Sequence, residues 1–202
     1  MLRVGLTGSI AVGKSFVLGV FRELGCFVLD ADQVARDVVA PGTDGLRRIA
    51  NEFGDEVLQP TGQLDRSKLG SIVFADEQKR LLLNSIVHPL VFQEQEQWLR
   101  ECEAEKPDGI AIVDAALMIE SGGYKRYDQL IVVWCEPDLQ LKRLMSRDNL
   151  SRADAERRIA SQMPQEEKKK FADHLIDTSY GFEVTRERTT EVFHRLQQSP
   201  KS

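Results

Sequence analysis

The stretch GLTGSIAVGKSF, residues 5–16, decides the fold. An apolar run over residues 2–6 leads into Gly8, and the triplet Gly13-Lys14-Ser15 follows after four further residues. This spacing, between an apolar run and a helical segment, is typical of a phosphate-binding loop. The backbone N–H groups of such a loop converge on a phosphate at the positive end of the following helix. The sequence therefore predicts a site for a nucleoside triphosphate.

Nine consecutive residues are assigned to this site. Lys14 is expected to bridge the β- and γ-phosphates, and the hydroxyl of Ser15 is expected to ligate Mg²⁺. The alternative is a glycine-rich turn with a surface lysine, which the strand–loop–helix setting disfavours. The predicted nucleotide-binding residues are Gly8, Ser9, Ile10, Ala11, Val12, Gly13, Lys14, Ser15 and Phe16.

Apolar runs along the chain predict the rest of the fold. They lie at 2–6, 26–29, 110–113, 130–134 and, more weakly, 175–176. Continuous runs separated by helical stretches favour a parallel sheet covered on both faces. Right-handed crossovers then give a doubly wound, five-stranded α/β sheet, whose ligands lie beyond the carboxyl ends of the strands. Asp30 and Asp114 each follow a run and are expected at that edge.

Two helical segments interrupt this pattern. We expect a single domain whose core comprises about 1–38, 108–137 and 171–200, with a helical insertion at about 39–107 and a helical lid at about 138–170. Pro89 is expected at the first position of a helix that runs to about Lys106. A helical pair is expected over about 138–171.

The lid segment is unusually basic. Residues 142–170 hold nine basic and five acidic side chains, whereas the whole chain has a net charge of −5. One interpretation is a lid that closes arginines over a transferring phosphoryl group and excludes water. The other is a solvated helical face. The candidate arginines are Arg143, Arg147 and Arg158.

Composition narrows the class of protein. The negative net charge of this 202-residue chain argues against nucleic-acid binding. No apolar run approaches the roughly 20 residues that a membrane span needs, and the first strand leaves no room for a signal peptide. Cys26, Cys102 and Cys135 form no paired motif, so we expect packing roles in a reducing, cytoplasmic setting.

The stretch LDADQVAR, residues 29–36, suggests acceptor chemistry. A helix that begins near Ala31 places Asp32 and Arg36 on one face. An acceptor hydroxyl needs a carboxylate to orient it and take its proton, and an acceptor with its own phosphates needs an arginine. An exposed ion pair between Asp32 and Arg36 explains the pattern equally well. Asp114 is expected to hold Mg²⁺ through water, with a helix cap as its alternative role.

Two other classes of nucleotide-binding protein do not fit this sequence. A guanine-nucleotide switch needs DxxG and NKxD elements, but no aspartate stands three residues before any glycine. None of Asn51, Asn84 and Asn149 is followed by lysine. A motor or helicase is normally larger and multidomain. A small phosphotransferase remains.

These motifs make the chain similar to the dephospho-coenzyme A kinases along nearly its whole length. The DAD-x-x-x-R element close behind the loop is the specific part of the resemblance. The matching stretches are GLTGSIAVGKS (5–15), LDADQVARDVV (29–39), HPLV (88–91), VDAALMIE (113–120), RDNLSRADAERRIASQ (147–162) and ADHLIDTS (172–179).

The resemblance implies a phosphate-loop NTPase-type fold with a five-stranded parallel sheet, a helical acceptor-binding insertion and a lid. It implies that the γ-phosphoryl of ATP is transferred to the ribose 3′-hydroxyl of dephospho-CoA, the last step of coenzyme A synthesis. Mg²⁺ with ATP would be the cofactor, and no nucleic acid or membrane partner is implied.

The resemblance also implies roles for individual residues. Lys14, Arg143 and Arg147 would be catalytic, and Asp32 would be the general base. Ser15 would ligate the metal directly and Asp114 through water. The acceptor side would comprise Thr7, Asp32, Arg36, His88 and Asp114, and Glu120 would be the acidic end of the turn after Asp114.

The chain departs from the family pattern inside the loop and beyond it. Ala11 and Val12 replace smaller residues, Ala116 replaces a proline, and Thr178 replaces an asparagine. If residue 11 needs a positive φ, alanine there costs roughly 1 kcal/mol. Two alternative functions follow, namely another phosphate-loop kinase for nucleosides or small molecules, or a catalytically weak nucleotide-binding paralogue.

Overall fold

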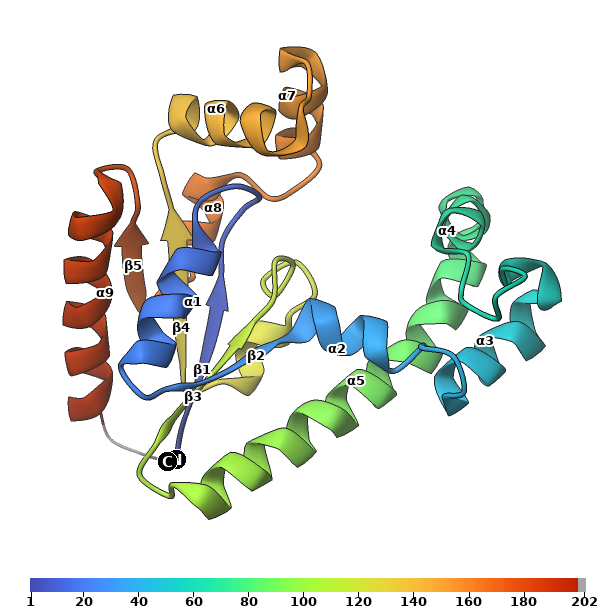
Figure 1. The fold of residues 1–202 in the computed structure, drawn as a ribbon, viewed down its shortest axis with the longest axis horizontal. Coiled ribbons are helices and arrows are strands. Elements are labelled where there is room, and N and C mark those ends of the chain that lie inside the picture. The colour runs from blue at the N-terminus through green and yellow to red at the C-terminus, as the bar shows by residue number, and fades with distance from the viewer. Residues whose placement is uncertain (200–202) are drawn as a thin grey trace. The chain divides into compact units, whose positions relative to one another are not determined.

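The computed structural model describes residues 1–199. The chain divides into two compact units, one made of residues 1–30 with 102 onward and the other of Ala31–Glu101 (Figure 1). Each unit has its own buried apolar cluster. The phosphate loop and the whole sheet belong to the first unit. The domain boundaries expected from the sequence remain a prediction.

A parallel sheet of five strands forms the centre of the first unit. Its strand order is β2-β3-β1-β4-β5, and every neighbouring pair is parallel. This order confirms the predicted doubly wound fold. Because β1 is the central strand, the loop that follows it lies at the middle of the carboxyl edge. The strands are β1 (Leu2–Thr7), β2 (Phe27–Asp30), β3 (Ile110–Asp114), β4 (Gln129–Trp134) and β5 (His174–Asp177).

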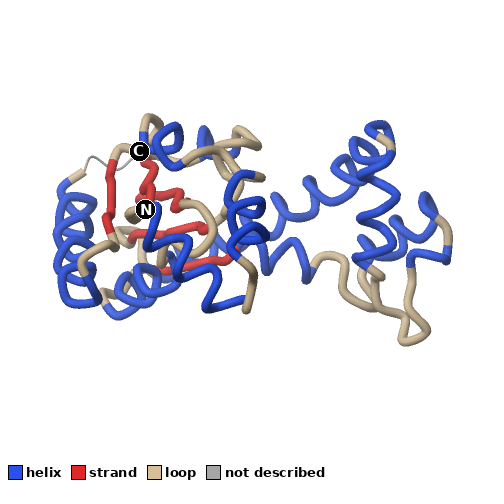
Figure 2. The backbone as a smooth tube through the Cα atoms, turned by 90° about the horizontal axis from the view of Figure 1, so that it is seen from above, coloured by secondary structure: helices blue, strands red, loops and turns tan. Residues whose placement is uncertain are grey.

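Helices flank the sheet of the first unit, as Figure 2 shows in blue around the red strands. Helices α1 and α9 pack against each other. The segment expected to hold a helical pair instead forms three helices, α6 to α8. The helices are α1 (Lys14–Glu23), α6 (Pro137–Asp148), α7 (Arg152–Ala160), α8 (Gln165–Lys169) and α9 (Gly181–Gln198), with a short 3₁₀ turn at Gly123–Arg126.

The core of the first unit explains why its strands are uniformly apolar. Leu6, Ile112 and Ile131 from three neighbouring strands are fully buried, and Phe21 packs with them from α1. Val12 from the phosphate loop belongs to the same cluster and is also fully buried. Cys26 and Cys135 lie in this cluster and Cys102 is buried, which confirms that the cysteines pack.

The second unit is helical. Its core joins Ile49 and Phe53 of one helix to Leu69 and Ile86 of two others. Residues 31–101 contain no strand beyond an isolated bridge between Leu58 and Leu64. Its helices are α2 (Ala31–Asp37), α3 (Asp44–Phe53), α4 (Arg66–Ala75) and most of α5 (Glu77–Glu105), with a 3₁₀ turn at Asp55–Val57.

The prediction that Pro89 begins a helix is wrong. Pro89 lies inside α5, twelve residues after its first turn begins at Glu77. An interior proline removes one backbone hydrogen bond and costs about 3 kcal/mol in an isolated helix. Here Ile86 is buried before the proline and Leu99 after it, so packing holds both halves of the helix.

Within the described residues, no helix is both long enough and apolar enough to cross a membrane.

Candidate active site

The phosphate loop joins β1 to α1 through two glycines that cannot be replaced. A Cβ at Gly8 would lie 2.4 Å from the carbonyl oxygen of Val133 in β4, so only glycine lets the two backbones approach. Gly13 caps α1 with φ 94°, a left-handed conformation that glycine adopts without strain. The strand–loop–helix junction predicted from residues 5–16 is confirmed.

The remaining loop residues differ in how far their side chains reach solvent. Ser9 and Val12 are buried, so these two can meet a ligand only through their backbone. Ile10, Ala11 and Phe16 are partly exposed, and Ser15 is exposed at the start of α1. The loop therefore presents mainly backbone groups and one hydroxyl.

Ala11 occupies the position where the sequence raised a question of strain. Its φ is 61°, in the left-handed region that disfavours residues with a Cβ. Residue 11 therefore does adopt a positive φ, and the cost of roughly 1 kcal/mol expected for alanine in place of glycine applies. The neighbouring Val12 compensates by packing in the core, which fixes the loop from one side.

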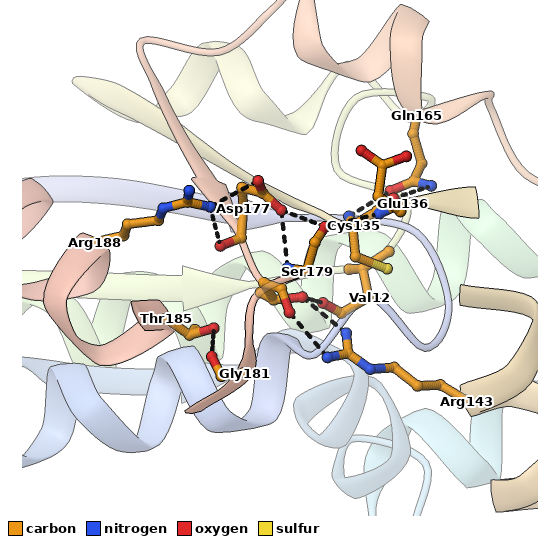
Figure 3. Close-up of polar contacts among 11 residues, drawn as sticks. Val12, Cys135, Glu136, Arg143, Gln165, Asp177, Ser179, Gly181, Thr185 and Arg188 are labelled. Carbon is orange, nitrogen blue, oxygen red and sulfur yellow. Dashed lines mark hydrogen bonds and ion pairs between the residues drawn. The ribbon is translucent and has the colours of Figure 1, made fainter. Parts of the chain in front are cut away.

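Thr178, immediately after β5, links the loop to Arg143 by hydrogen bonds; Figure 3 labels Val12 and Arg143 on its two sides. Its hydroxyl donates to the carbonyl oxygen of Val12 at 2.7 Å and accepts from Nη1 of Arg143 at 2.8 Å. Nη2 of Arg143 donates to the carbonyl oxygen of Thr178 at 2.9 Å. Next to it, Asp177 accepts from the N–H of Ser179 and pairs with Arg188 at 2.7 Å, which holds this turn in place.

Lys14 and Asp114 lie together at the carboxyl edge of the sheet. Nζ of Lys14 is 3.4 Å from the carbonyl oxygen of Gly8 and 3.7 Å from Oδ1 of Asp114. Asp114 ends β3 and is paired in register with Asp30 at the end of β2. The strand-end carboxylates predicted from the sequence are therefore neighbours, beside the lysine of the loop.

The turn after β3 is held by buried polar groups. The carbonyl oxygen of Ala116 accepts from Nζ of Lys168 at 2.8 Å and from the hydroxyl of Thr7 at 3.2 Å. Lys168 is fully buried and pairs with Glu120 at 2.9 Å, and the N–H of Met163 donates to Glu120 at 3.2 Å. Thr7 is fully buried, so its hydroxyl acts through this turn.

The ionisation of Glu120 depends on this pairing. Burial opposes its negative charge, but the hydrogen bond and charge of Lys168 and the N–H of Met163 outweigh it and hold the pKa of the carboxyl below its ordinary value of 4.5. The Glu120 carboxyl is therefore ionised at neutral pH.

The candidate lid arginines divide into two groups. Arg143 in α6 is linked to the loop by its hydrogen bond to Thr178. Arg147 pairs with Asp148 at 2.7 Å, and Arg158 pairs with the same carboxylate. The hydrogen bond from Arg147 and both guanidinium charges hold the pKa of Asp148 below its ordinary range. Both Arg147 and Arg158 have half-exposed side chains.

A pocket of about 160 Å³ opens beside the end of the phosphate loop. The rings of Phe16 and Phe182 lie 4.8 Å apart on its wall, and Phe182 is 71% exposed. The pocket is lined by Gly13, Phe16, Arg143, Thr178, Gly181, Phe182 and Thr185.

Three residues of the predicted acceptor side belong to the second unit. Asp32 and Arg36 lie in the first and last turns of α2, and both are exposed. The predicted alternative was an ion pair between Asp32 and Arg36. In the described part of the chain these two side chains form no ion pair, and Nη1 of Arg36 donates to Gln33 at 3.2 Å. His88 is exposed inside α5, with its ring 6.0 Å from that of Phe92.

Sequence reasoning missed several residues that support the site. The sequence pattern places Lys168 only in a basic segment. It indicates no role for Gln140 and Gln162, whose side chains bind the loop. Gln140 stands four residues before the buried Leu144 in α6, so helical periodicity places it on the buried face. A polar side chain at such a position signals a buried partner.

A hydroxyl and a carboxylate are the oxygen ligands that fit Mg²⁺, which keeps several waters and seldom uses a cage of protein groups. Ser15 at the helix start and Asp114 at the strand end provide them. Among the described residues, no group of three or more His, Cys, Asp or Glu could hold a metal ion.

The fold and site together define a phosphate-loop kinase for a small molecule. The chain belongs to the dephospho-CoA kinase family, whose model matches residues 2–183. It is 42% identical over 192 residues to the dephospho-CoA kinase of Carboxydothermus hydrogenoformans, covering 95% of this chain and 93% of that one. The dephospho-CoA kinase of Bacillus anthracis is 48% identical over 176 residues, with 86% of each chain covered.

A solved structure agrees with the sequence relatives. The dephospho-CoA kinase of Campylobacter jejuni superposes with a TM-score of 0.72 at 29% identity, covering 97% of both chains. The resemblance drawn from the motifs is therefore confirmed. The chain is a kinase of this family that transfers phosphate from ATP.

We predict that Ala11→Gly raises the free energy of unfolding by about 1 kcal/mol, because glycine adopts a φ of 61° without a Cβ clash. Urea denaturation measures this change. The same substitution at Ala153, inside α7, should lower the free energy by about 0.5–1 kcal/mol. A loss of stability in both variants would contradict the strain at Ala11.

We predict that Glu120→Gln destabilises the fold by about 1–3 kcal/mol, because solvent reaches Glu120 but its loss leaves Nζ of the buried Lys168 without its partner charge. The double variant Glu120→Gln/Lys168→Met should recover most of this loss, as a double-mutant cycle would measure. Additive losses would show that the two side chains act separately.

The same pair predicts a pH dependence. Because folding lowers the pKa of Glu120, its ionisation stabilises the fold fully above about pH 4.5. The stabilisation is lost as the pH falls through the lower pKa of the folded state. Denaturation at a series of pH values should therefore show a weaker acid dependence in Glu120→Gln than in the wild type.

Proposed function

We propose that the chain transfers the γ-phosphoryl of ATP to the ribose 3′-hydroxyl of dephospho-CoA, giving CoA and ADP. The observation that carries the proposal is the phosphate loop with Lys14 between the Gly8 carbonyl and Asp114. There Lys14 would meet the β- and γ-phosphates together with the N–H groups at the start of α1. Family membership supplies the identity of the acceptor.

Mg²⁺ is proposed to be held by the hydroxyl of Ser15 and, through water, by Asp114. When bound with ATP it neutralises charge on the β- and γ-phosphates. The hard oxygen character of both groups and their places at the helix start and strand end support this assignment.

Asp32 is proposed as the base for the acceptor hydroxyl. The 3′-oxygen forms a bond to the γ-phosphorus while the bond to the β–γ bridging oxygen breaks, and the hydroxyl proton passes to the Asp32 carboxylate. Asp32 is exposed in the first turn of α2, so its carboxylate is accessible to an acceptor. Arg36 and His88 would bind the acceptor's own phosphates, with Asp114 bordering the acceptor and Thr7 acting through the turn after β3.

Arg143 and Arg147 are proposed to neutralise charge that develops during transfer. Arg143 is supported by its place at Thr178 beside the loop, and Arg147 would have to leave Asp148 to act. The pocket between Phe16 and Phe182 suits the flat, partly apolar nucleoside of ATP. Replacing ATP by other nucleoside triphosphates in the assay below measures how strongly the base is selected.

The setting of this activity is proposed to be the cytoplasm, with no nucleic-acid partner. Three buried free cysteines support a reducing compartment. A net charge of −5 supports the absence of nucleic-acid binding.

Incubation of the chain with ATP, Mg²⁺ and dephospho-CoA tests the proposal, with CoA formation followed by mass spectrometry and the position of the new phosphate by fragmentation. Formation of CoA with a 3′-phosphate is expected. If nucleosides or small sugars are phosphorylated instead, the chain is another small-molecule kinase. If ATP binds and no acceptor is phosphorylated, the chain is a nucleotide-binding paralogue, which the strain at Ala11 would favour.

We predict that Asp32→Asn lowers turnover by about two to four orders of magnitude while the dissociation constant for ATP changes little, because the carboxylate serves the acceptor. Steady-state kinetics and calorimetry measure the two quantities. Asp37→Asn is the matched control, since Asp37 is an exposed aspartate at the other end of α2. Equal turnover in the two variants would remove Asp32 from the mechanism.

A further inference from the structure

Both backbone polar groups of Ile10, in the phosphate loop, are bound by glutamine side chains. The N–H of Ile10 donates to Oε1 of Gln162 at 2.8 Å, and its carbonyl oxygen accepts from Nε2 of Gln140 at 2.8 Å. Gln140 lies in α6 and is 2% exposed, and Gln162 follows the end of α7. The segment after β4 thus holds the loop from α6 and from the connection between α7 and α8.

The backbone of Cys135, just after β4, fixes the orientation of the Gln165 amide and, through it, that of Gln140. The N–H of Cys135 can only donate, and Oε1 of Gln165 accepts from it at 3.1 Å (Figure 3). Nε2 of Gln165 therefore donates, to the carbonyl of Cys135 at 3.1 Å and to Oε1 of Gln140 at 2.9 Å. This leaves Nε2 of Gln140 to face Ile10. We call Cys135, Gln165, Gln140 and Ile10 the glutamine relay.

The relay acts on the one strained peptide of the loop. The carbonyl of Ile10 and the N–H of Ala11 belong to the same trans peptide, so they point in opposite directions. Holding this carbonyl against α6 turns the N–H of Ala11 away from α6. Because φ of Ala11 is 61°, this orientation has an intrinsic cost, and the hydrogen bond from Gln140 offsets it.

We propose that Gln140 and Gln162 are positioning residues for the triphosphate, with Gln140 holding the Ile10–Ala11 peptide so that the Ala11 N–H is presented to the phosphates. The inference rests on the proposed function only in taking ATP as the ligand of the loop. Neither glutamine touches the reacting atoms. Their effect is expected on affinity for nucleotides that carry β- and γ-phosphates, and not on affinity for AMP.

Two matched variants test the donor and the acceptor. Gln140→Glu removes the donor to the Ile10 carbonyl, whereas Gln162→Glu keeps an acceptor for the Ile10 N–H, and both add one negative charge beside the same residue. At pH 8 we expect the ATP dissociation constant to rise about tenfold in Gln140→Glu and less than about threefold in Gln162→Glu. The dissociation constant for AMP should be unchanged in both. Calorimetry with each nucleotide measures these constants.

The pH profile of Gln140→Glu gives a second signature. A carboxyl that faces a carbonyl oxygen has a raised pKa, and once protonated it can donate as the amide did. ATP affinity of Gln140→Glu should therefore recover toward that of the wild type between about pH 8 and pH 5. A residue with only a structural role would show no such recovery.

Equal weakening of ATP and AMP binding, or equal effects of the two Glu variants, would overturn the inference. If Gln140→Glu does not fold, Gln162→Met decides the matter, because it removes the acceptor at a partly exposed position and should weaken ATP binding alone. Unchanged ATP affinity in Gln162→Met would then refute it. A wild-type chain that binds ATP but forms no CoA would contradict the proposed function and leave this inference standing.

Discussion

The structure depends on how the carbonyl groups of the phosphate loop are bound. A loop that offers N–H groups to phosphates must turn the opposite ends of those peptides toward the protein. The carbonyl of Ile10 is bound by Gln140, and that of Val12 by Thr178. Both donors come from segments that follow the strands β4 and β5. In the sheet β4 lies next to β1 and β5 next to β4, so both segments begin at the same carboxyl edge, on one side of the loop.

Hydrogen bonds also hold two of the positions where the sequence departs from the pattern expected from the resemblance. Thr178, in place of an asparagine, donates to Val12 and accepts from Arg143, so one hydroxyl links the loop to the basic helix. Ala116, in place of a proline, has its carbonyl fixed by the buried Lys168 instead of by ring geometry. Hydrogen bonds from distant segments here replace conformational restriction within the loop and the turn.

The features predicted from the sequence are those with a local signature. Apolar runs predict the strands, and the spacing of Gly8, Gly13 and Lys14 predicts the phosphate loop. Pro89 was misplaced because proline marks a helix start only where tertiary packing does not hold a longer helix. Helical periodicity indicates that Gln140 is buried but cannot identify its partner, since Gln140 and Ile10 are 130 residues apart. Long-range contacts between side chain and backbone are fixed by topology and not by local propensity.

Two hydrogen bonds to the phosphate loop limit how the segment over residues 138–170 can move. Gln140 binds the loop at the start of the segment, and Gln162 binds it again near the end. Closure of residues 138–170 as one body would break both bonds and expose the buried polar groups, each at a cost of about 1–3 kcal/mol. Motion that keeps these bonds is confined to the part between them, the second half of α6 with α7. That part carries Arg147 and Arg158, both held by Asp148, whereas Arg143 stays at Thr178. Asp148 is therefore the group that any approach of the outer arginines to phosphate must displace.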